Sequence, residues 1–115
     1  MQENKLFKYD LLSEIKKYFR TNLNKELCGV VLNSGEFVAL RNNNSSMYSF
    51  QLDPKLYFLK KHFYCIVHSH PLGDAYPSGD DIQKACALNL PYLVYSCIYD
   101  NFVYFDLEKC IAMKG

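Results

Sequence analysis

Two histidines and an aspartate in the second half of the chain have the residue types and spacing of a metal site. His68 and His70 follow the apolar segment 63–67, which we predict to be a buried strand that ends near Pro71. Residues two apart on a strand point to the same face, so both imidazoles should face one side of a sheet. Asp81 follows His70 after ten intervening residues and offers a carboxylate as third ligand. Two imidazoles and a carboxylate suit a tetrahedral zinc ion whose fourth position stays open to water.

Each of these residues also has an ordinary structural explanation. An isolated H-x-H pair is common and, taken alone, indicates polar residues at the end of a strand. Ser78 and Asp81 form an S-x-x-D pattern, in which Ser78 would be the N-cap of a helix and Asp81 its third residue. The two interpretations are compatible, because a capped first turn would fix the backbone of Asp81. Asp80, which should face another way on the helix, and Asp74, in the preceding loop, are rival ligands.

Hydrolysis at a centre of this kind needs a base and a group that stabilises the developing oxyanion. Bound zinc lowers the pKa of its water to about 7, which creates hydroxide at neutral pH. Glu26 begins a predicted strand and Ser78 stands beside Asp81, so either could serve in the remaining roles. Taken alone, Glu26 is better explained as a solvated residue at the start of a strand.

The elements that must position these residues follow from hydrophobic periodicity and turn signals. Helices are predicted over 10–20, 55–62 and 78–90, the last with Ile82, Ala85 and Cys86 on its inward face and Pro91 as its stop. Strands are predicted over 26–32, 36–40, 48–52, 63–67, 92–99 and 102–105, with a turn at 33–35 and a polar surface loop at 41–46. This order predicts one α/β (α+β) domain over 1–115, with helices packed on a single mixed, curved sheet.

Composition limits the classes of function. The 115 residues suit one domain, and 50% hydrophobic residues are too many for a disordered chain. The formal net charge is +1, with no basic stripe, so nucleic acid is a poor candidate partner. No apolar run is long enough to span a bilayer, and the polar N-terminus does not resemble a secretory signal. We therefore expect a cytoplasmic protein that binds neither nucleic acid nor membrane.

Other reactive or aromatic residues receive structural interpretations. Five cysteines, an odd number without C-x-x-C spacing, are predicted to be reduced thiols of the core, Cys28 among them. His62 is expected to be exposed at the end of a helix. Three tyrosines are expected on the last two strands, where they pack or flank a cleft: Tyr95, Tyr99 and Tyr104.

The combination of these motifs resembles a known family. Glu26, the run His68-Ser69-His70-Pro71 and the pair Ser78-x-x-Asp81 resemble the JAMM motif, E … H-[ST]-H-P … S-x-x-D, of the JAB/MPN zinc metallopeptidases. The resemblance covers nearly the whole chain. Further similar segments are 26–29 (the family's E-x-C-G strand), 50–54 (before its second helix) and 90–94 (the strand after the motif helix). These flanking features are most similar to the short forms found in phage tail assembly proteins.

This resemblance implies a JAB/MPN-like (cytidine-deaminase-like) architecture and a catalytic zinc site. It implies His68, His70 and Asp81 as zinc ligands, Glu26 as general base and Ser78 as oxyanion donor. The implied activity is hydrolysis of a peptide or isopeptide bond, in phage tail proteins, cell-wall peptides, or ubiquitin-like or sulfur-carrier tails. The intact motif argues against a catalytically silent binding module, and the lack of a basic patch argues against a DNA-associated role.

Overall fold

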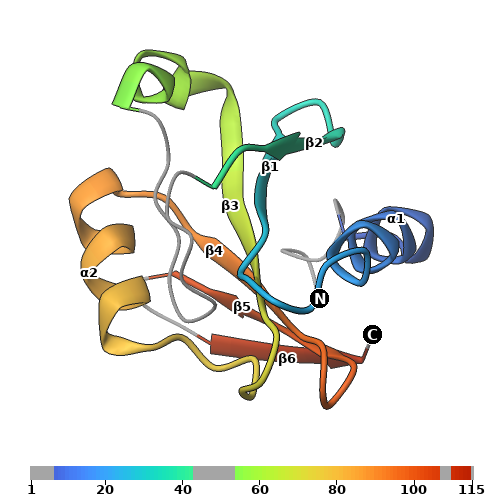
Figure 1. Ribbon diagram of the computed structural model, residues 1–115. Helices are drawn as coiled ribbons and strands as arrows, with labels where there is room; N and C mark the ends of the chain where they lie inside the picture. Colours follow the sequence, from blue (N-terminus) through green and yellow to red (C-terminus); the bar gives the residue numbers. More distant parts are fainter. Residues whose placement is uncertain (1–6, 43–53, 107–109, 115) are drawn as a thin grey trace.

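A mixed six-stranded sheet forms the centre of the computed structural model, which describes residues 7–42, 54–106 and 110–114 (Figure 1). Its strands lie in the order β2-β1-β3-β4-β5-β6. Their bounds are β1 Cys28–Leu32, β2 Phe37–Leu40, β3 Phe63–His70, β4 Tyr92–Ser96, β5 Asn101–Phe105 and β6 Cys110–Lys114. Among these strands β3 and β4 are the one parallel pair, and a helical crossover joins them as a parallel pair requires.

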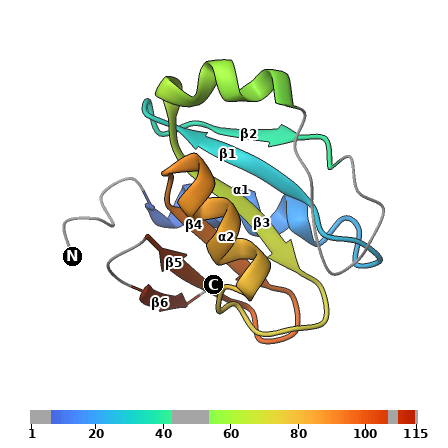
Figure 2. The same ribbon diagram turned by 90° about the vertical axis from the view of Figure 1, so that its left-hand side faces the viewer.

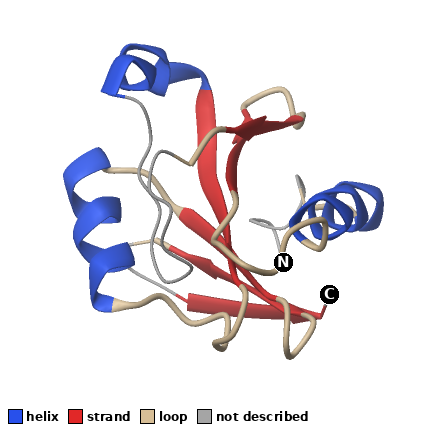
Figure 3. Ribbon diagram, viewed as in Figure 1, coloured by secondary structure: helices blue, strands red, loops and turns tan. Residues whose placement is uncertain are grey.

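Helices cover both faces of the sheet. Helix α1 (Tyr9–Phe19) packs on one face and α2 (Gly79–Leu88), the crossover between β3 and β4, lies on the other (Figures 1 and 3). Figure 2 shows α2 running across β3 and β4, with the 3-10 helix η2 (Pro54–His62) at the end of the sheet where β3 begins. The prediction of a mixed α+β domain with helices on a curved sheet is therefore confirmed. In the described part of the chain, no helix has the length and apolar character needed to cross a membrane.

Alternation along the strands divides the apolar side chains between the two faces of the sheet, where the two larger buried clusters form. The core under α1 contains Phe7, Leu11, Ile15, Phe19, Val31, Cys65, Val67, Leu93, Tyr95, Cys97, Phe102 and Tyr104. The core under α2 contains Cys28, Val30, Ile66, Ala85 and Tyr92. Successive residues of β3 thus point to opposite cores, and the face toward α2 is the one that continues to His68 and His70.

Helix α2 differs from its prediction in its end and in its inward face. It stops before Pro91 because Asn89 adopts the left-handed conformation, with φ of 53°, that commonly ends helices. Ala85 is buried as predicted, but Ile82 and Cys86 are exposed, so the predicted inward face is wrong at these two positions. The inward stripe runs through Asp81 and Ala85, four residues apart, because the carboxylate of Asp81 is itself buried.

The last strands also differ from the sequence prediction. β4 ends at Ser96, and residues 97–100 form a turn in which the Ser96 hydroxyl accepts the Tyr99 N–H. Tyr99 therefore lies in this turn and is exposed, whereas Tyr95 and Tyr104 are buried strand residues as expected. Strand β6, which pairs with β5, was not predicted. The expected strand over 48–52 and most of the loop over 41–46 lie outside the described residues.

The five cysteines are all free, but they do not all belong to the core. Cys28, Cys65 and Cys97 are buried, while Cys86 and Cys110 are exposed, so the core prediction is wrong for the last two. Burial raises the pKa of the Cys28 thiol to about 12, and the nearby Glu26 carboxylate acts in the same direction. This thiol therefore remains protonated at neutral pH and behaves as a small apolar side chain.

Candidate metal centre

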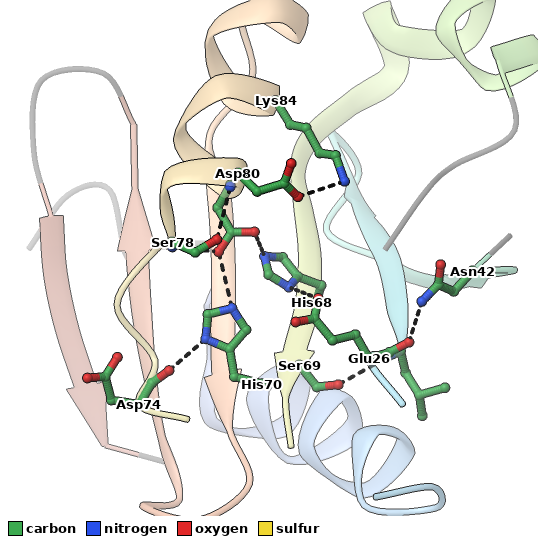
Figure 4. Close-up of polar contacts among 11 residues, drawn as sticks. Glu26, Asn42, His68, Ser69, His70, Asp74, Ser78, Asp80 and Lys84 are labelled. Carbon is green, nitrogen blue, oxygen red and sulfur yellow. Dashed lines mark hydrogen bonds and ion pairs between the residues drawn. The ribbon is translucent and has the colours of Figure 1, made fainter. Parts of the chain in front are cut away.

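The end of β3 places both histidines of the motif on the face that α2 covers (Figure 4). His68 is fully buried, and its ring packs edge-on against Tyr92 with 5.6 Å between ring centroids. His70 is the last residue of β3 and is partly exposed. The ring centroids of the two histidines are 5.0 Å apart. The same-face arrangement expected from their spacing is therefore present in the structure.

Asp81 reaches both imidazoles from the first turn of α2. His68 Nε2 lies 3.1 Å from Asp81 Oδ1, and His70 Nε2 lies 3.1 Å from Asp81 Oδ2. The same residue completes a capping box with Ser78, whose Oγ accepts the Asp81 N–H and whose N–H donates to Asp81 Oδ2. The helix cap and the approach to the histidines therefore coexist, and the cap fixes the turn that carries the carboxylate.

Glu26 joins the same cluster from the segment just before β1. The residue is buried, at 3% exposure, and Oε1 lies 3.3 Å from His68 Nδ1 (Figure 4). The interpretation of Glu26 as a solvated residue at a strand start is wrong. Antiparallel pairing explains the contact, because Cys28 lies opposite His68 and Glu26 precedes Cys28 by two residues on the same face. One potential ligand atom from each of Glu26, His68 and His70 lies within 4.8 Å of the others.

The orientation of the His70 ring is fixed by a backbone group. His70 Nδ1 lies 2.6 Å from the carbonyl oxygen of Asp74. A carbonyl can only accept, so Nδ1 carries a proton in this contact. Nε2, the nitrogen on the side of Asp81, is therefore the one available to a metal ion. A bond of this kind is typical of metal-binding histidines, whose second nitrogen is usually held by a carbonyl or carboxylate.

Electrostatics at the centre favours charged side chains despite their burial. Burial alone would lower the pKa of His68, but the carboxylates of Asp81 and Glu26 more than offset this and raise it to about 9. Burial alone would raise the pKa of Asp81, but the charge of His68 and hydrogen bonds from both histidines and Ser78 hold it well below its ordinary value. Asp81 is thus a carboxylate at neutral pH. His68 must release a proton before a nitrogen can bind a metal.

The rival residues do not contribute carboxylates to the cluster. Asp80 points away and pairs with Lys84 at 3.0 Å on the exposed side of α2 (Figure 4). The Asp74 carboxylate accepts the N–H of Tyr76, so Asp74 contributes to the centre through its carbonyl. His62 is exposed at the end of η2, as expected.

Two supporting residues have roles that the sequence did not predict. The Ser69 hydroxyl accepts the Leu27 N–H at 2.9 Å, and the Asn42 side chain donates to the Glu26 carbonyl at 2.7 Å. Asn42 is buried, although its polar segment reads as a surface loop. The place of Ser69 between the two histidines was a usable signal for a role at the site, whereas Asn42 had none, since it lies in a run of similar polar residues.

The donor set fits a zinc ion. Two imidazoles and one carboxylate are a ligand combination that catalytic zinc sites use, with a further position left to water or substrate. Both Nε2 atoms already converge on one carboxylate, and supporting hydrogen bonds hold His70 and Asp81. These donors come from two separate parts of the chain, the end of β3 and the start of α2, and the Glu26 carboxylate, which could also be a ligand, comes from a third, the segment before β1.

Fold and site together define a small α+β domain with a potential metal centre at the end of its central strand. The chain matches the family described as prokaryotic homologs of the JAB domain over residues 9–106 and belongs to that family. No curated protein gives a match. A Desulfitobacterium hafniense protein known from a solution structure is similar in fold, with a TM-score of 0.65 and 21% identity over 92% of this chain and 87% of that one.

Proposed function

We propose that this protein is a zinc-dependent peptidase of the JAMM type that hydrolyses a peptide or isopeptide bond. The observation that carries the proposal is the buried carboxylate of Glu26, 3.3 Å from His68 and on the same side of the sheet as His70 and Asp81. A metal-binding site alone requires only the ligands. A second buried carboxylate beside them is the kind of group that hydrolysis needs in addition, a base for the reacting water.

The proposed roles divide the cluster into ligands and reacting groups. His68, His70 and Asp81 would hold the zinc ion. When bound, the ion supplies a Lewis acid that acidifies water and polarises the carbonyl of the bond to be cleaved. The Asp74 carbonyl keeps the His70 ring in the orientation that presents Nε2. The capping box keeps the Asp81 carboxylate turned toward both rings.

Glu26 and Ser78 would act on the substrate. The Glu26 carboxylate accepts a proton from the attacking water while the water oxygen bonds to the carbonyl carbon of the substrate. Glu26 then passes that proton to the amine nitrogen as the C–N bond breaks. The Ser78 hydroxyl uses a lone pair to accept the Asp81 N–H, which leaves its own proton able to donate to the developing oxyanion. Water supplies the hydroxyl of the new carboxyl group and the proton of the released amine, so the reaction needs no further reactant.

A catalytically silent binding module is the alternative, and the environment of Glu26 disfavours it. Burial of a carboxylate costs free energy unless charged or hydrogen-bonding partners compensate. His68 provides such a partner, and a general base must lie beside the metal ligands in this way, whereas a module that binds only a protein does not need a buried carboxylate there. In one form of this alternative, Glu26 only orients His68 by accepting its Nδ1–H. The experiment below must distinguish that role from the role of a general base.

For the substrate, we propose a protein or peptide in the cytoplasm. Phage tail proteins are the first substrates to test, because the flanking segments resemble the short forms in tail assembly proteins. Ubiquitin-like or sulfur-carrier tails are the second. The neighbouring genes discriminate between the two, since tail genes would select assembly and a sulfur-carrier gene would select processing of that carrier.

Glu26→Gln is the decisive variant, because it preserves the shape of the side chain and removes its basicity. Zinc content should stay near one equivalent, while cleavage of a peptide library, followed by mass spectrometry, should fall by about a hundred- to ten-thousandfold. Wild-type cleavage by this variant would exclude Glu26 as the base. Loss of zinc in the same variant would assign it to the ligands or to the orientation of His68.

A further inference from the structure

The peptide unit that joins Glu26 to Leu27 is held in an unusual way. Pairing of β1 with β2 ends at Cys28 opposite Leu40, so this peptide lies beyond that ladder. Its two polar groups, the Glu26 carbonyl and the Leu27 N–H, are nevertheless both bonded, and in each case the partner is a side chain. The backbone of the proposed base is thus fixed by side chains at the point where regular pairing with β2 has stopped.

The two bonds act on opposite edges of one planar group. Asn42, buried at 7% exposure, donates from Nδ2 to the Glu26 carbonyl at 2.7 Å (Figure 4). Ser69 accepts the Leu27 N–H at 2.9 Å, and its own N–H donates to the Leu27 carbonyl at 3.0 Å. Because a peptide is planar, bonds at both edges fix the orientation of the whole unit. That orientation sets the direction in which the Glu26 side chain leaves the backbone.

We propose that Asn42 is a positioning residue, which holds the Glu26 carbonyl so that the Glu26 carboxylate faces His68. Ser69 holds the other edge of the same peptide. The position of the Glu26 carboxylate depends on these contacts whatever the activity is, whereas the expected effect on turnover rests on the proposed function of Glu26. Without Asn42, the Glu26 carbonyl loses its bond on the β2 side, and the peptide can rotate toward another partner. The carboxylate, attached at that backbone position, then leaves its place beside the His68 ring.

The test uses Asn42→Ala and the isosteric Asn42→Asp, which removes the donor and places an oxygen against the carbonyl. Asn33→Ala is the matched control, because Asn33 Nδ2 also donates to a backbone carbonyl, that of Lys61 at 3.0 Å, far from the centre. The full chain as purified is studied by crystallography and by the ¹⁵N chemical shifts of the His68 ring. Glu26→Gln provides the reference spectrum for a changed neighbour at His68 Nδ1.

Both Asn42 variants should retain zinc and displace the Glu26 carboxylate from His68 Nδ1. The His68 Nδ1 resonance should move away from its wild-type position, as we also expect for Glu26→Gln, while Asn33→Ala should keep the wild-type spectrum. With a cleaved peptide in hand, kcat should fall by about a hundredfold, the effect of a misplacement of about 1 Å, with little change in KM. A purely structural role would lower the melting temperature without this split between kcat and KM.

An unchanged Glu26–His68 contact and an unchanged His68 resonance in Asn42→Asp would overturn the proposal. If neither of these Asn42 variants folds, Asn42→Ser keeps a small polar side chain that is too short to reach the Glu26 carbonyl, and a wild-type Glu26 position there would overturn the proposal equally. The positioning role of Asn42 and the general-base role of Glu26 can be refuted independently. A displaced carboxylate together with a fully active Glu26→Gln variant would leave the positioning role standing and remove the proposed chemistry.

Discussion

His70 is the member of the cluster at which the site meets solvent. Its side chain is 13% exposed, whereas those of His68, Asp81 and Glu26 are almost fully enclosed. Ser78, which is exposed, lies on the same open side at the start of α2. We therefore expect a substrate to approach past His70 and Ser78, with Glu26 behind the reacting atoms.

Ser78→Ala separates the two functions proposed for this hydroxyl. Loss of the N-cap should cost about 0.5–2 kcal/mol of the free energy of unfolding. Loss of an oxyanion donor should lower kcat by about a hundred- to a thousandfold. Thermal melts and turnover of the same peptide measure both effects. Normal turnover with a lowered melting temperature would reduce Ser78 to a helix cap.

His70→Ala should remove the bound zinc, and His62→Ala should not. His62 is the matched control because it is an exposed histidine at the end of η2. Metal analysis of protein purified without chelator gives the stoichiometry. A chelator should also lower the melting temperature of the wild type but not that of His70→Ala, because an ion that binds the folded state stabilises it. Full zinc occupancy in His70→Ala would place the metal elsewhere.

At the scale of elements, the contact between β1 and β2 depends on a residue without a side chain. A Cβ at Gly29 would lie 2.6 Å from both the Phe37 ring and the Val38 carbonyl oxygen. The Phe37 ring in turn packs against Tyr18 and Phe19 of α1. The absence of a side chain at Gly29 therefore leaves room for the Phe37 ring of β2 to lie across β1 and pack against α1. Glu26 precedes β1 and Asn42 follows β2, so both residues lie at the same end of this antiparallel pair.

Gly29→Ala should therefore destabilise the fold by about 1–3 kcal/mol, the usual cost of overpacking a core. The backbone oxygen of Val38 cannot move as freely as a side chain, which favours the upper part of this range. Gly79→Ala is the control, because a Cβ there meets no atom within 4 Å and should leave stability unchanged or slightly increased. Equal denaturation midpoints for the two variants would contradict the proposed close approach.

At the scale of the whole molecule, a polar network joins α1 to the turn between β4 and β5. Arg20 donates to the Tyr95 hydroxyl at 3.0 Å and to the Cys97 carbonyl at 3.1 Å. The Tyr95 hydroxyl donates to Asp100 at 2.6 Å, and Lys16 lies 2.9 Å from the same carboxylate. The network anchors the helix of one face to the sheet, while the site occupies the other face.

This network predicts a pH-dependent contribution to stability. The hydrogen bond from Tyr95, and then that from Lys16, lower the pKa of Asp100 from its ordinary value. A carboxyl with a lowered pKa in the folded state stabilises the fold above its unfolded pKa of about 3.9, and this contribution is lost as pH falls through the folded value. Asp100→Asn should thus lower the melting temperature at pH 7, and the difference should vanish in acid.

The effect should be small, because Asp100 is half exposed and solvent screens its charge. Asp10→Asn, at the other end of α1, serves as the control for a lost surface carboxylate. If the difference in melting temperature between the wild type and Asp100→Asn persists unchanged to low pH, the ionised carboxylate is not what stabilises the turn.

The sequence by itself determined the local features of this protein. The two-residue spacing of His68 and His70 on an apolar strand, the S-x-x-D cap and the stripe of α1 depend on neighbours along the chain, and each is present in the structure. The motif also named the four residues that converge on the centre. Family membership followed from the same pattern and from the match over 9–106.

Tertiary structure alone decided burial and partnership, because both depend on which distant segments pack together. Glu26 is buried because the segment before β1 lies beside the end of β3, and Asn42 is buried because its side chain bonds that segment. Asp81 occupies the inward stripe of α2, which moves Ile82 to the surface against the prediction from hydrophobicity. Local periodicity cannot reveal that a carboxylate will replace an apolar residue in the core. The cost of burying this carboxylate is offset by two histidines, and these lie on another element.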